Sequence, residues 1–413
     1  MIKLNILNAY LGLRFFSSLF FWVIVTVEIV YQATVVGLNP FQLVLVGTFL
    51  EIVTFIFEVP TGIVADLYSR KLSVAFGVIL VGLGFIFEGL IPTFEAVLIA
   101  QLIWGFGYTF ISGAREAWIA DEVGDKHAGK AFIKGQQAGK IGTFIGIAIS
   151  MVLANIDIRI PLIAGGLFYA MQALYIMLFM PENNFTPTEA SKRETFKSMK
   201  KAFFEGIGLI KRNNVLLIIV ITSVIFGMFS EGWDRLWTPY MIKDFTFPAI
   251  GNIKQVVWFG LITMVEAFLV VIVTEIFRKK TNFSSHRSTV KALFWANLLL
   301  IIGVIGFGFA TGFPMAVAMY WMTAMFRGTK EPLYNAWINQ NTTSKIRATV
   351  FSLCSQADAI GQAIGGPILG IIASFIAIRT SIWGAGIILI PVLFLYIYSI
   401  QKHKIERSGN EMK

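Results

Sequence analysis

The chain has 413 residues, of which 56% are hydrophobic and only 14% are charged, and its mean hydropathy is +0.73. This composition excludes a soluble globular protein and indicates a polytopic membrane protein. The net charge of +10 does not indicate a nucleic-acid partner, because most Lys and Arg residues fall in segments predicted on one side of the membrane. That asymmetry predicts that both termini lie in the cytoplasm.

The hydrophobic segments predict twelve helices that cross the membrane. A helix needs about 20 residues to span the hydrocarbon core of a bilayer, and short polar turns such as 37–40 separate the segments. The predicted spans are 10–36, 40–65, 72–91, 95–119, 131–154, 161–180, 213–241, 251–277, 289–311, 313–338, 349–375 and 379–400.

A polar, lysine-rich stretch at 181–212 is the long break between spans. We expect residues 1–180 to form an N-terminal six-helix bundle, 181–212 a cytoplasmic linker, and 213–413 a C-terminal six-helix bundle with a short cytoplasmic tail. Apolar residues alternate with lysines over 192–212, which predicts an amphipathic helix on the inner membrane surface. The predicted fold class is an all-α membrane protein.

The two halves resemble one another in sequence. The run Gly-Ala-Arg-Glu at 113–116 returns as Gly-Thr-Lys-Glu at 328–331. Gly142 returns as Gly361 with an offset of 219, and the stretch 66–71 has a degenerate copy at 275–280, with an offset of 209. Matches in this order, with nearly constant offsets, predict two pseudo-symmetric bundles.

A charged stretch at 62–71 joins the second and third spans. Asp66 ends the apolar run, Arg70 and Lys71 supply the positive charge of a cytoplasmic loop, and Gly62 is expected to allow close helix approach. The stretch resembles the loop signature of the major facilitator superfamily, Gly-x-x-x-Asp-x-x-Gly-Arg-Arg/Lys. Gly62, Asp66, Arg70 and Lys71 match, and Ser69 replaces the second glycine. The alternative is an ordinary tight turn between two membrane helices.

This resemblance implies a fold and a mode of action. Members of the superfamily pack twelve helices in two parallel repeats, hold substrate between them and open to each side of the membrane in turn. Spans one, four, seven and ten line their central cavity. The chain is most similar to the twelve-helix multidrug and tetracycline exporters, which exchange a drug for protons.

Span one carries polar residues at helical spacing. Arg14, Phe21 and Glu28 are seven residues apart and share a face, which Gln32 continues by one turn. A charge within the bilayer costs several kcal/mol, so an ionisable residue there is a functional candidate. Glu28 is therefore our first candidate to take up a proton or meet a cation. The alternative is a structural partner for a basic residue on another helix.

Other acidic residues of the spans are further candidates. Glu51 lies near the middle of span two. Span seven ends with Glu231 and Asp234, and Glu231 is placed to pair with Arg235 four residues later. Asp234 corresponds to Glu28 if the ends of spans one and seven are superimposed, so we favour Asp234 over Glu231.

Charged pairs recur in the predicted inner halves of spans four and ten, as Arg115 with Glu116 and Lys330 with Glu331. Adjacent side chains on a helix point about 100° apart, so we expect one of each pair to face the cavity and the other to contact a neighbouring helix. Arg327 adds a positive charge one turn before Lys330.

Asp121, just past span four, is predicted to contact Arg70 of the hinge. Together with Gly62, Asp66 and Lys71, these residues would form a conformational latch that breaks as the halves tilt. The alternative is a set of solvated loop charges.

Spans five and eleven are rich in glycine, for which we expect helix packing rather than chemistry. Residues 361–370 resemble the antiporter motif of drug exporters, but the exporters carry it in span five. Gln101 stands where they have an arginine four residues before a glycine, here Gly105. Both departures weaken the case for proton antiport. Asp358 and Lys140 fall one position apart when the halves are aligned, and they either hold the halves together or belong to separate ion pairs.

The sequence has no phosphate-binding loop, cofactor motif or nucleophile constellation, so we expect neither ATP-driven pumping nor an enzyme nor a cofactor. Cys354 is single, which excludes an internal disulfide. His127, His286 and His403 fall in predicted loops without metal-ligand spacing, and we expect each to be solvated.

We therefore predict a secondary transporter of the cell (cytoplasmic) membrane that exports a hydrophobic, drug-like compound, cationic or neutral, with proton coupling. Its partners would be protons, lipid and a small-molecule substrate; we expect a monomer and no nucleic acid. Two alternatives stay open. One is a proton-coupled transporter of a polar anionic or zwitterionic metabolite, served by the cations Arg14, Arg115, Arg327 and Lys330. The other is a non-transporting membrane receptor on the same fold.

Overall fold

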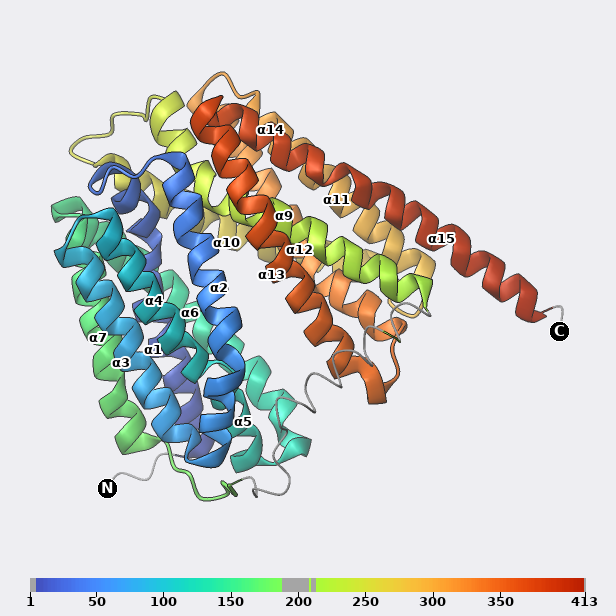
Figure 1. The fold of residues 1–413 in the computed structure, drawn as a ribbon, viewed down its shortest axis with the longest axis horizontal. Coiled ribbons are helices and arrows are strands. Elements are labelled where there is room, and N and C mark those ends of the chain that lie inside the picture. Colours follow the sequence, from blue (N-terminus) through green and yellow to red (C-terminus); the bar gives the residue numbers. More distant parts are fainter. Residues whose placement is uncertain (1–4, 188–207, 209–212, 412–413) are drawn as a thin grey trace. The chain divides into compact units, whose positions relative to one another are not determined.

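The computed structural model describes residues 5–187, 208 and 213–411, and its regular elements within these residues are all helices (Figure 1). The predicted all-α fold class is confirmed. The predicted amphipathic helix at 192–212 lies almost entirely outside the described residues. In chain order the helices are α1 (Ile6–Thr34), α2 (Pro40–Leu67), α3 (Arg70–Leu90), α4 (Phe94–Ile111), α5 (Ala114–Val123), α6 (Asp125–Ile156), α7 (Arg159–Phe179), α9 (Asn214–Asp244), α10 (Gln255–Lys280), α11 (His286–Gly308), α12 (Phe313–Gln340), α13 (Ser344–Phe375), α14 (Ile378–Ile388) and α15 (Ile390–Glu411).

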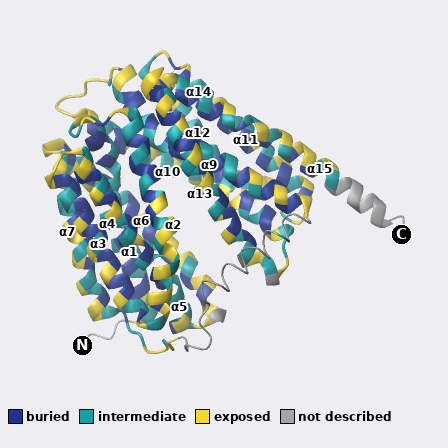
Figure 2. Cartoon of the chain, in the orientation of Figure 1, coloured by how far each residue is buried: buried dark blue, intermediate teal, exposed yellow. Residues whose placement is uncertain are grey.

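Eleven helical stretches of the described chain are long and apolar enough to cross a membrane, with α4 and α5 forming one of them and α14 with α15 another. The twelfth predicted span is α12, which has 28 residues but is less apolar because it carries Arg327, Lys330 and Glu331. Large apolar side chains remain exposed on the helices, among them Leu178, Phe268 and Phe394. Exposed positions recur along the helices in both halves of the chain (Figure 2). Hydrocarbon solvates such side chains without cost, as expected for helices that face lipid.

Two predicted spans are each broken into two helices. Between α4 and α5, Gly113 adopts a φ of 73°, a left-handed conformation that glycine tolerates and that interrupts the helix. Between α14 and α15, the chain leaves the helix at Leu389, shortly before Pro391, which has no backbone N–H to donate. Neither break lowers the hydropathy, which is why the spans were predicted as continuous.

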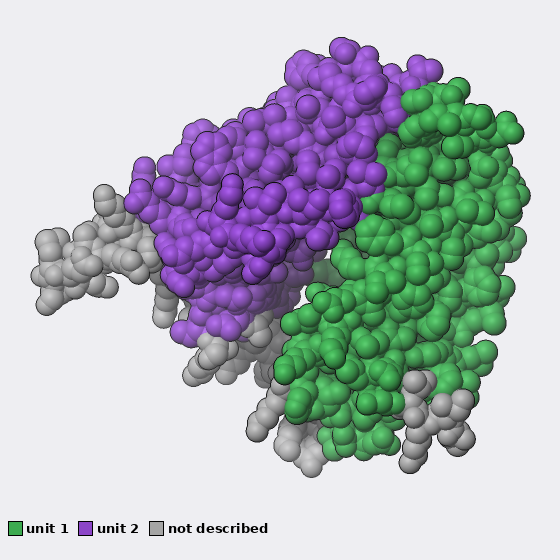
Figure 3. All heavy atoms as spheres, turned by 180° about the vertical axis from the view of Figure 1, so that it is seen from behind, with its two compact units in different colours: residues 1–193, 247–264 green, residues 194–246, 265–413 purple. Residues whose placement is uncertain are grey.

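The chain divides into two compact units, each described by itself below (Figure 3). Unit 1 comprises residues 1–193 and 247–264, and unit 2 comprises residues 194–246 and 265–413. Helices α1–α7 belong to unit 1, and α9 and α11–α15 to unit 2, while α10 contributes its first residues to unit 1 and the rest to unit 2. That the two halves work as separate six-helix bundles stays a prediction.

The packing within each unit repeats the sequence similarity between the halves. In unit 1, α6 packs along α1, and a Cβ atom at Gly142 would overlap the backbone carbonyl of Phe15. In unit 2, α13 packs along α9, and a Cβ atom at Gly361 would overlap the carbonyl of Val224. The glycines therefore serve close helix packing, as predicted.

The same contacts correct the alignment of α1 with α9. They match Phe15 with Val224, an offset of 209, which places Asp234 opposite Val25 and not opposite Glu28. The predicted correspondence of Asp234 with Glu28 is wrong. It depended on the predicted ends of the two spans, whereas α1 ends at Thr34 and α9 continues to Asp244.

The expectation that His286 is a solvated loop residue is also wrong. His286 is the first residue of α11 and is buried. Its Nε2 atom lies 3.2 Å from the hydroxyl of Ser399, and its ring lies near that of Trp337. A hydroxyl partner and an aromatic neighbour together explain why an imidazole can be buried here.

Candidate functional site

Four polar side chains of unit 1 form a buried group, here called the carboxyl cluster: Glu28, Gln32, Glu88 and Gln101. Glu28 and Gln32 lie one turn apart on the same face of α1. Glu88 comes from α3 and Gln101 from α4. Glu28 is 3% exposed and the other three are 0% exposed. The structure thus brings two predicted candidates together with two residues from other helices.

Hydrogen bonds connect both carboxylates of the cluster to both amides. Nε2 of Gln32 donates to Oε1 of Glu28 at 3.2 Å and to Oε1 of Glu88 at 2.8 Å. Nε2 of Gln101 donates to Oε1 of Glu28 at 3.0 Å and to Oε2 of Glu88 at 3.3 Å. Neutral donors thus stabilise the two acids within the membrane span, where a carboxyl group can also exist in its protonated, neutral form.

Glu88 was missed by the sequence reasoning, although a usable signal was present. It falls inside the predicted span 72–91, so the rule that selected Glu28 applies to it equally. Gln101 was considered only as a departure from the exporters' arginine. Its amide takes part in the cluster as a neutral donor to both carboxylates. Glu51, another predicted acid of this half, is half-buried on α2.

A second group of charges in unit 1 joins α1 to α5. The guanidinium of Arg115 donates two hydrogen bonds to Oε1 of Glu116, at 2.9 and 3.1 Å. Arg14 of α1 lies 3.6 Å from the same oxygen. Arg115 and Glu116 are thus also bonded to each other, because the long arginine side chain folds back onto its neighbour, and that one of them faces the cavity stays a prediction. The expected contact with a neighbouring helix is present, through Arg14.

The hinge between α2 and α3 contains the predicted contact of Arg70 with Asp121. Arg70 forms an ion pair with Asp121 at the end of α5 and lies 3.4 Å from Asp66 one turn before it. Nζ of Lys71 donates to the carbonyl of Met177 at 2.9 Å. Gly62 does not match its expectation, because a Cβ atom there would meet no atom of unit 1 within 4 Å. The predicted close approach at Gly62 is thus not present within this unit.

Glu182, which follows α7, completes the hinge and was not predicted. Its carboxylate accepts hydrogen bonds from the Ser69 hydroxyl at 2.6 Å, the backbone N–H of Arg70 at 2.6 Å and that of Lys71 at 3.1 Å. Ser69 also caps α3, since its Oγ accepts from the N–H of Leu72 at 3.0 Å. The serine that replaces the signature's second glycine therefore has a role of its own. A carboxylate at the N-terminus of α3 is further stabilised by the helix dipole.

In unit 2, Asp234 of α9 forms a two-point ion pair with Arg327 of α12. Such a fork-to-fork pair fixes both groups more firmly than a single contact does. The Arg327 guanidinium also lies 5.8 Å from the centroid of the Phe229 ring. Two predicted candidates are thus bonded to each other. Glu231 and Arg235 form the predicted pair, at 3.3 Å.

In the described part of unit 2, Lys330, Glu331 and Asp358 form no ion pair with Asp234 or Arg327. Lys330 places its ammonium 3.4 Å from the centroid of the Phe226 ring, a cation–π contact. Asp358 accepts a hydrogen bond of 2.8 Å from Gln362, one turn further along α13. Glu331 is exposed. Within the described residues, no group of three or more His, Cys, Asp or Glu side chains is arranged to hold a metal ion.

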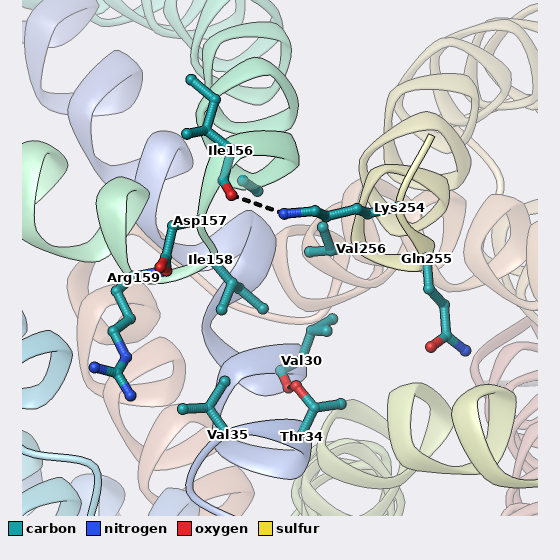
Figure 4. Close-up of a pocket in the computed structure, with 11 residues that line it drawn as sticks. Val30, Thr34, Val35, Ile156, Asp157, Ile158, Arg159, Lys254, Gln255 and Val256 are labelled. Atoms are coloured by element: carbon teal, nitrogen blue, oxygen red, sulfur yellow. Dashed lines mark hydrogen bonds between the residues drawn. The ribbon is translucent and has the colours of Figure 1, made fainter. Parts of the chain in front are cut away.

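A surface pocket of unit 1 lies away from all of these residues (Figure 4). It has a volume of about 570 Å³ and is lined by the ends of α1 and α6, the start of α7 and the start of α10. Lys254 borders it and donates a hydrogen bond of 2.7 Å from Nζ to the carbonyl of Ile156. None of the predicted candidates lines this pocket.

Comparisons with known proteins agree with this architecture. A family model described as Major Facilitator Superfamily matches residues 10–290. An uncharacterised MFS-type transporter of Bacillus subtilis (strain 168), YxaM, is 24% identical over 357 residues, 86% of each chain. Multidrug resistance protein 1 of the same organism is 26% identical over 241 residues, which covers 53% of this chain and 59% of that protein. The solved nucleoside transporter NupG has a TM-score of 0.75 over 96% of this chain and 99% of its own, at 15% identity, which indicates a shared fold alone.

Proposed function

The chain belongs to the Major Facilitator Superfamily, and we propose that it is a secondary transporter that exports a hydrophobic, drug-like compound, cationic or neutral, in exchange for protons. In this proposal residues 1–180 and 213–413 form two bundles, joined by the linker 181–212, that expose the substrate to each side of the membrane in turn. The protein would act as a monomer in the cytoplasmic membrane with both termini in the cytoplasm.

Proton coupling rests on one observation, the burial of Glu28 among neutral amides. Glu28 is 3% exposed, and its carboxylate accepts hydrogen bonds from Gln32 and Gln101. An ionisable group kept inside a membrane span marks a proton or ion pathway in transporters of many kinds. A buried carboxyl group that accepts hydrogen bonds from neutral amides is a candidate to gain and lose a proton. This supports a coupling role for Glu28.

Aromatic side chains beside carboxylates support the proposed substrate class. In unit 2 the rings of Trp237 and Tyr320 lie 4.2 Å apart between centroids, and the Tyr320 hydroxyl donates a 2.5 Å hydrogen bond to Glu266. Aromatic faces attract both flat apolar molecules and organic cations. A nearby carboxylate adds electrostatic attraction for a cation. The same features would disfavour a small anion.

The proposal is tested by transport in proteoliposomes with an imposed pH gradient, using ethidium, a flat hydrophobic cation, as the probe. We expect ethidium to move against its gradient when the pH gradient is present and not when the gradient is dissipated. Glu28→Gln should abolish the gradient-driven movement. Glu95→Gln, at the exposed start of α4, is the matched control and should behave as wild type. Ethidium movement that is unaffected by the pH gradient would refute the coupling.

A second candidate function is proton-coupled transport of an anionic or zwitterionic metabolite. It is favoured by Lys330, whose ammonium rests on the Phe226 ring and lies 5.3 Å from the centroid of Tyr334. A cation held on aromatic rings in this way is available to a substrate carboxylate. The same proteoliposomes tested with radiolabelled glutamate distinguish the two functions, since this candidate predicts uptake that Lys330→Met removes. Lack of transport of either probe would favour the receptor alternative.

A further inference from the structure

We propose that Glu28 and Glu88 hold a single proton between them, and that the amide of Gln32 or of Gln101 turns its oxygen toward the carboxyl group and accepts a hydrogen bond from it when this proton binds. This inference rests on the proposed proton coupling, and it identifies Glu88 as the residue that shares the coupled proton with Glu28. The proton enters from water and forms one O–H bond on a carboxylate. The negative charge of the cluster falls by one, and no other covalent bond is made or broken.

The geometry ties the two carboxylates into one unit. Each amide nitrogen has two hydrogens, and in both glutamines one points to Glu28 and the other to Glu88. Two carboxylates that share a hydrogen-bond donor repel one another, and burial strengthens that repulsion. Binding one proton removes it. The two acids therefore titrate as a pair and not as separate groups.

The second, independent observation concerns the amide oxygens. Oε1 of Gln32 and Oε1 of Gln101 are both buried and have no hydrogen-bond partner. A buried polar atom without a partner is costly. A protonated carboxyl needs an acceptor for its O–H, and a carboxamide oxygen is a good one. The unpartnered oxygens are thus suited to the protonated state, as the amide nitrogens are to the charged state.

Other titratable groups on the surrounding helices contribute to the electrostatic environment of the carboxyl cluster. Tyr31 of α1 donates its hydroxyl to the backbone carbonyl of Glu88 at 2.8 Å and interacts electrostatically with the Glu88 carboxylate. Arg159 of α7 interacts electrostatically with Tyr31. Further titratable groups on the packed helices include Arg14 of α1, Glu51 of α2, Glu95 and Tyr108 of α4, Lys140 of α6 and Tyr169 of α7.

Infrared difference spectroscopy on the substrate-free protein in liposomes tests the pair directly. We expect the wild type to gain a protonated-carboxyl band on acidification, together with a change in the glutamine amide bands. Glu88→Gln should remove the amide change that accompanies protonation, and it should shift the pH at which the remaining carboxyl band reaches half its intensity. Glu88→Asp keeps a second carboxyl group and should restore the paired behaviour. Glu95→Gln should leave the spectrum unchanged apart from the signal of one exposed acid.

Two outcomes would overturn the proposal. One is a Glu28 carboxyl band whose pH midpoint is the same in Glu88→Gln as in the wild type, which would show that the two acids titrate separately. The other is an infrared spectrum that changes when Na⁺ replaces choline at constant pH, which would make the cluster a sodium site. Loss of fold is checked by the thermal unfolding midpoint of each variant. Since no substrate is present, a failure of ethidium transport would refute the proposed function while leaving a positive infrared result intact.

Discussion

The amide of Gln32 donates a 2.8 Å hydrogen bond to the carboxylate of Glu88, which lies 56 residues further along the chain. The bond joins α1 to α3 in the interior of unit 1, and Gln101 makes a similar connection from α4. The carboxyl cluster therefore holds three helices together in addition to its proposed exchange of a proton. Substitutions that keep the hydrogen bonds of the cluster can be compared with substitutions that remove them. This comparison separates its structural role from its proposed role in proton exchange.

Glu88→Ala should lower the free energy of unfolding by about 2–4 kcal/mol, because it leaves buried amide donors without acceptors and opens a cavity. Glu88→Gln keeps the shape and one acceptor, so its loss should be smaller. The unfolding midpoint of the purified protein measures both. Glu95→Ala at an exposed position should change stability by less than about 0.5 kcal/mol. Equal unfolding midpoints for Glu88→Ala and wild type would show that the cluster does not stabilise the fold.

Arg70→Gln should slow the switch between the two access states by roughly tenfold, a change of about 1.4 kcal/mol in the barrier, with little effect on substrate affinity. The reason is that Arg70 pairs with both Asp66 and Asp121 at the hinge, away from the carboxyl cluster. Turnover and ethidium binding measured on the same preparation give the two quantities. Lys134→Gln, on the exposed face of α6, serves as the control. Lost binding with normal turnover would refute the latch role.

Ser69→Ala should destabilise unit 1 by about 1 kcal/mol, the usual cost of losing a helix N-cap. The substitution removes both the cap on Leu72 and the hydrogen bond to Glu182. Glu182→Gln tests the carboxylate separately, since the amide can still accept a hydrogen bond but lacks the charge that the α3 dipole favours. Backbone hydrogen exchange at the start of α3 should rise in both variants. Unchanged exchange there would mean that Glu182 does not stabilise the hinge.

Gly142→Ala and Gly361→Ala should each destabilise the protein by about 1–3 kcal/mol, because the added methyl group overlaps a backbone carbonyl of the adjacent helix. The two losses should be similar, since the contacts are equivalent in the two units. Gly129→Ala is the control in the same helix as Gly142, where a Cβ atom meets nothing within 4 Å. It should be neutral or stabilising, as alanine favours helix more than glycine does. Destabilisation by Gly129→Ala as large as by Gly142→Ala would contradict the packing argument.

Features that depend on local sequence were predicted well. Apolar runs located the membrane spans because each must be long enough to cross hydrocarbon. The seven-residue spacing placed Glu28 on a polar face, and the contact of Arg70 with Asp121 followed from two charges placed just past neighbouring spans. The breaks at Gly113 and Leu389 were missed because they leave hydropathy unchanged.

Features that depend on helix rotation or on distant segments were not predicted. Spacing along α1 shows that Glu28 and Gln32 share a face, but it does not show which faces of α3 and α4 turn toward them. The contact of Gln32 with Glu88 could therefore be found only from the structure. Glu182 was missed for a similar reason, since it lies in the predicted linker and returns to the start of α3.

Proton movement driven by a substrate gradient tests the central claim of proton exchange most directly. Proteoliposomes with a trapped pH-sensitive dye and no initial pH gradient would be diluted into ethidium, with Glu28→Gln and protein-free liposomes measured in parallel. We expect the lumenal pH to rise as ethidium enters through the wild-type protein and to stay constant in the other two samples. Protein-dependent entry of ethidium at constant lumenal pH would contradict proton exchange.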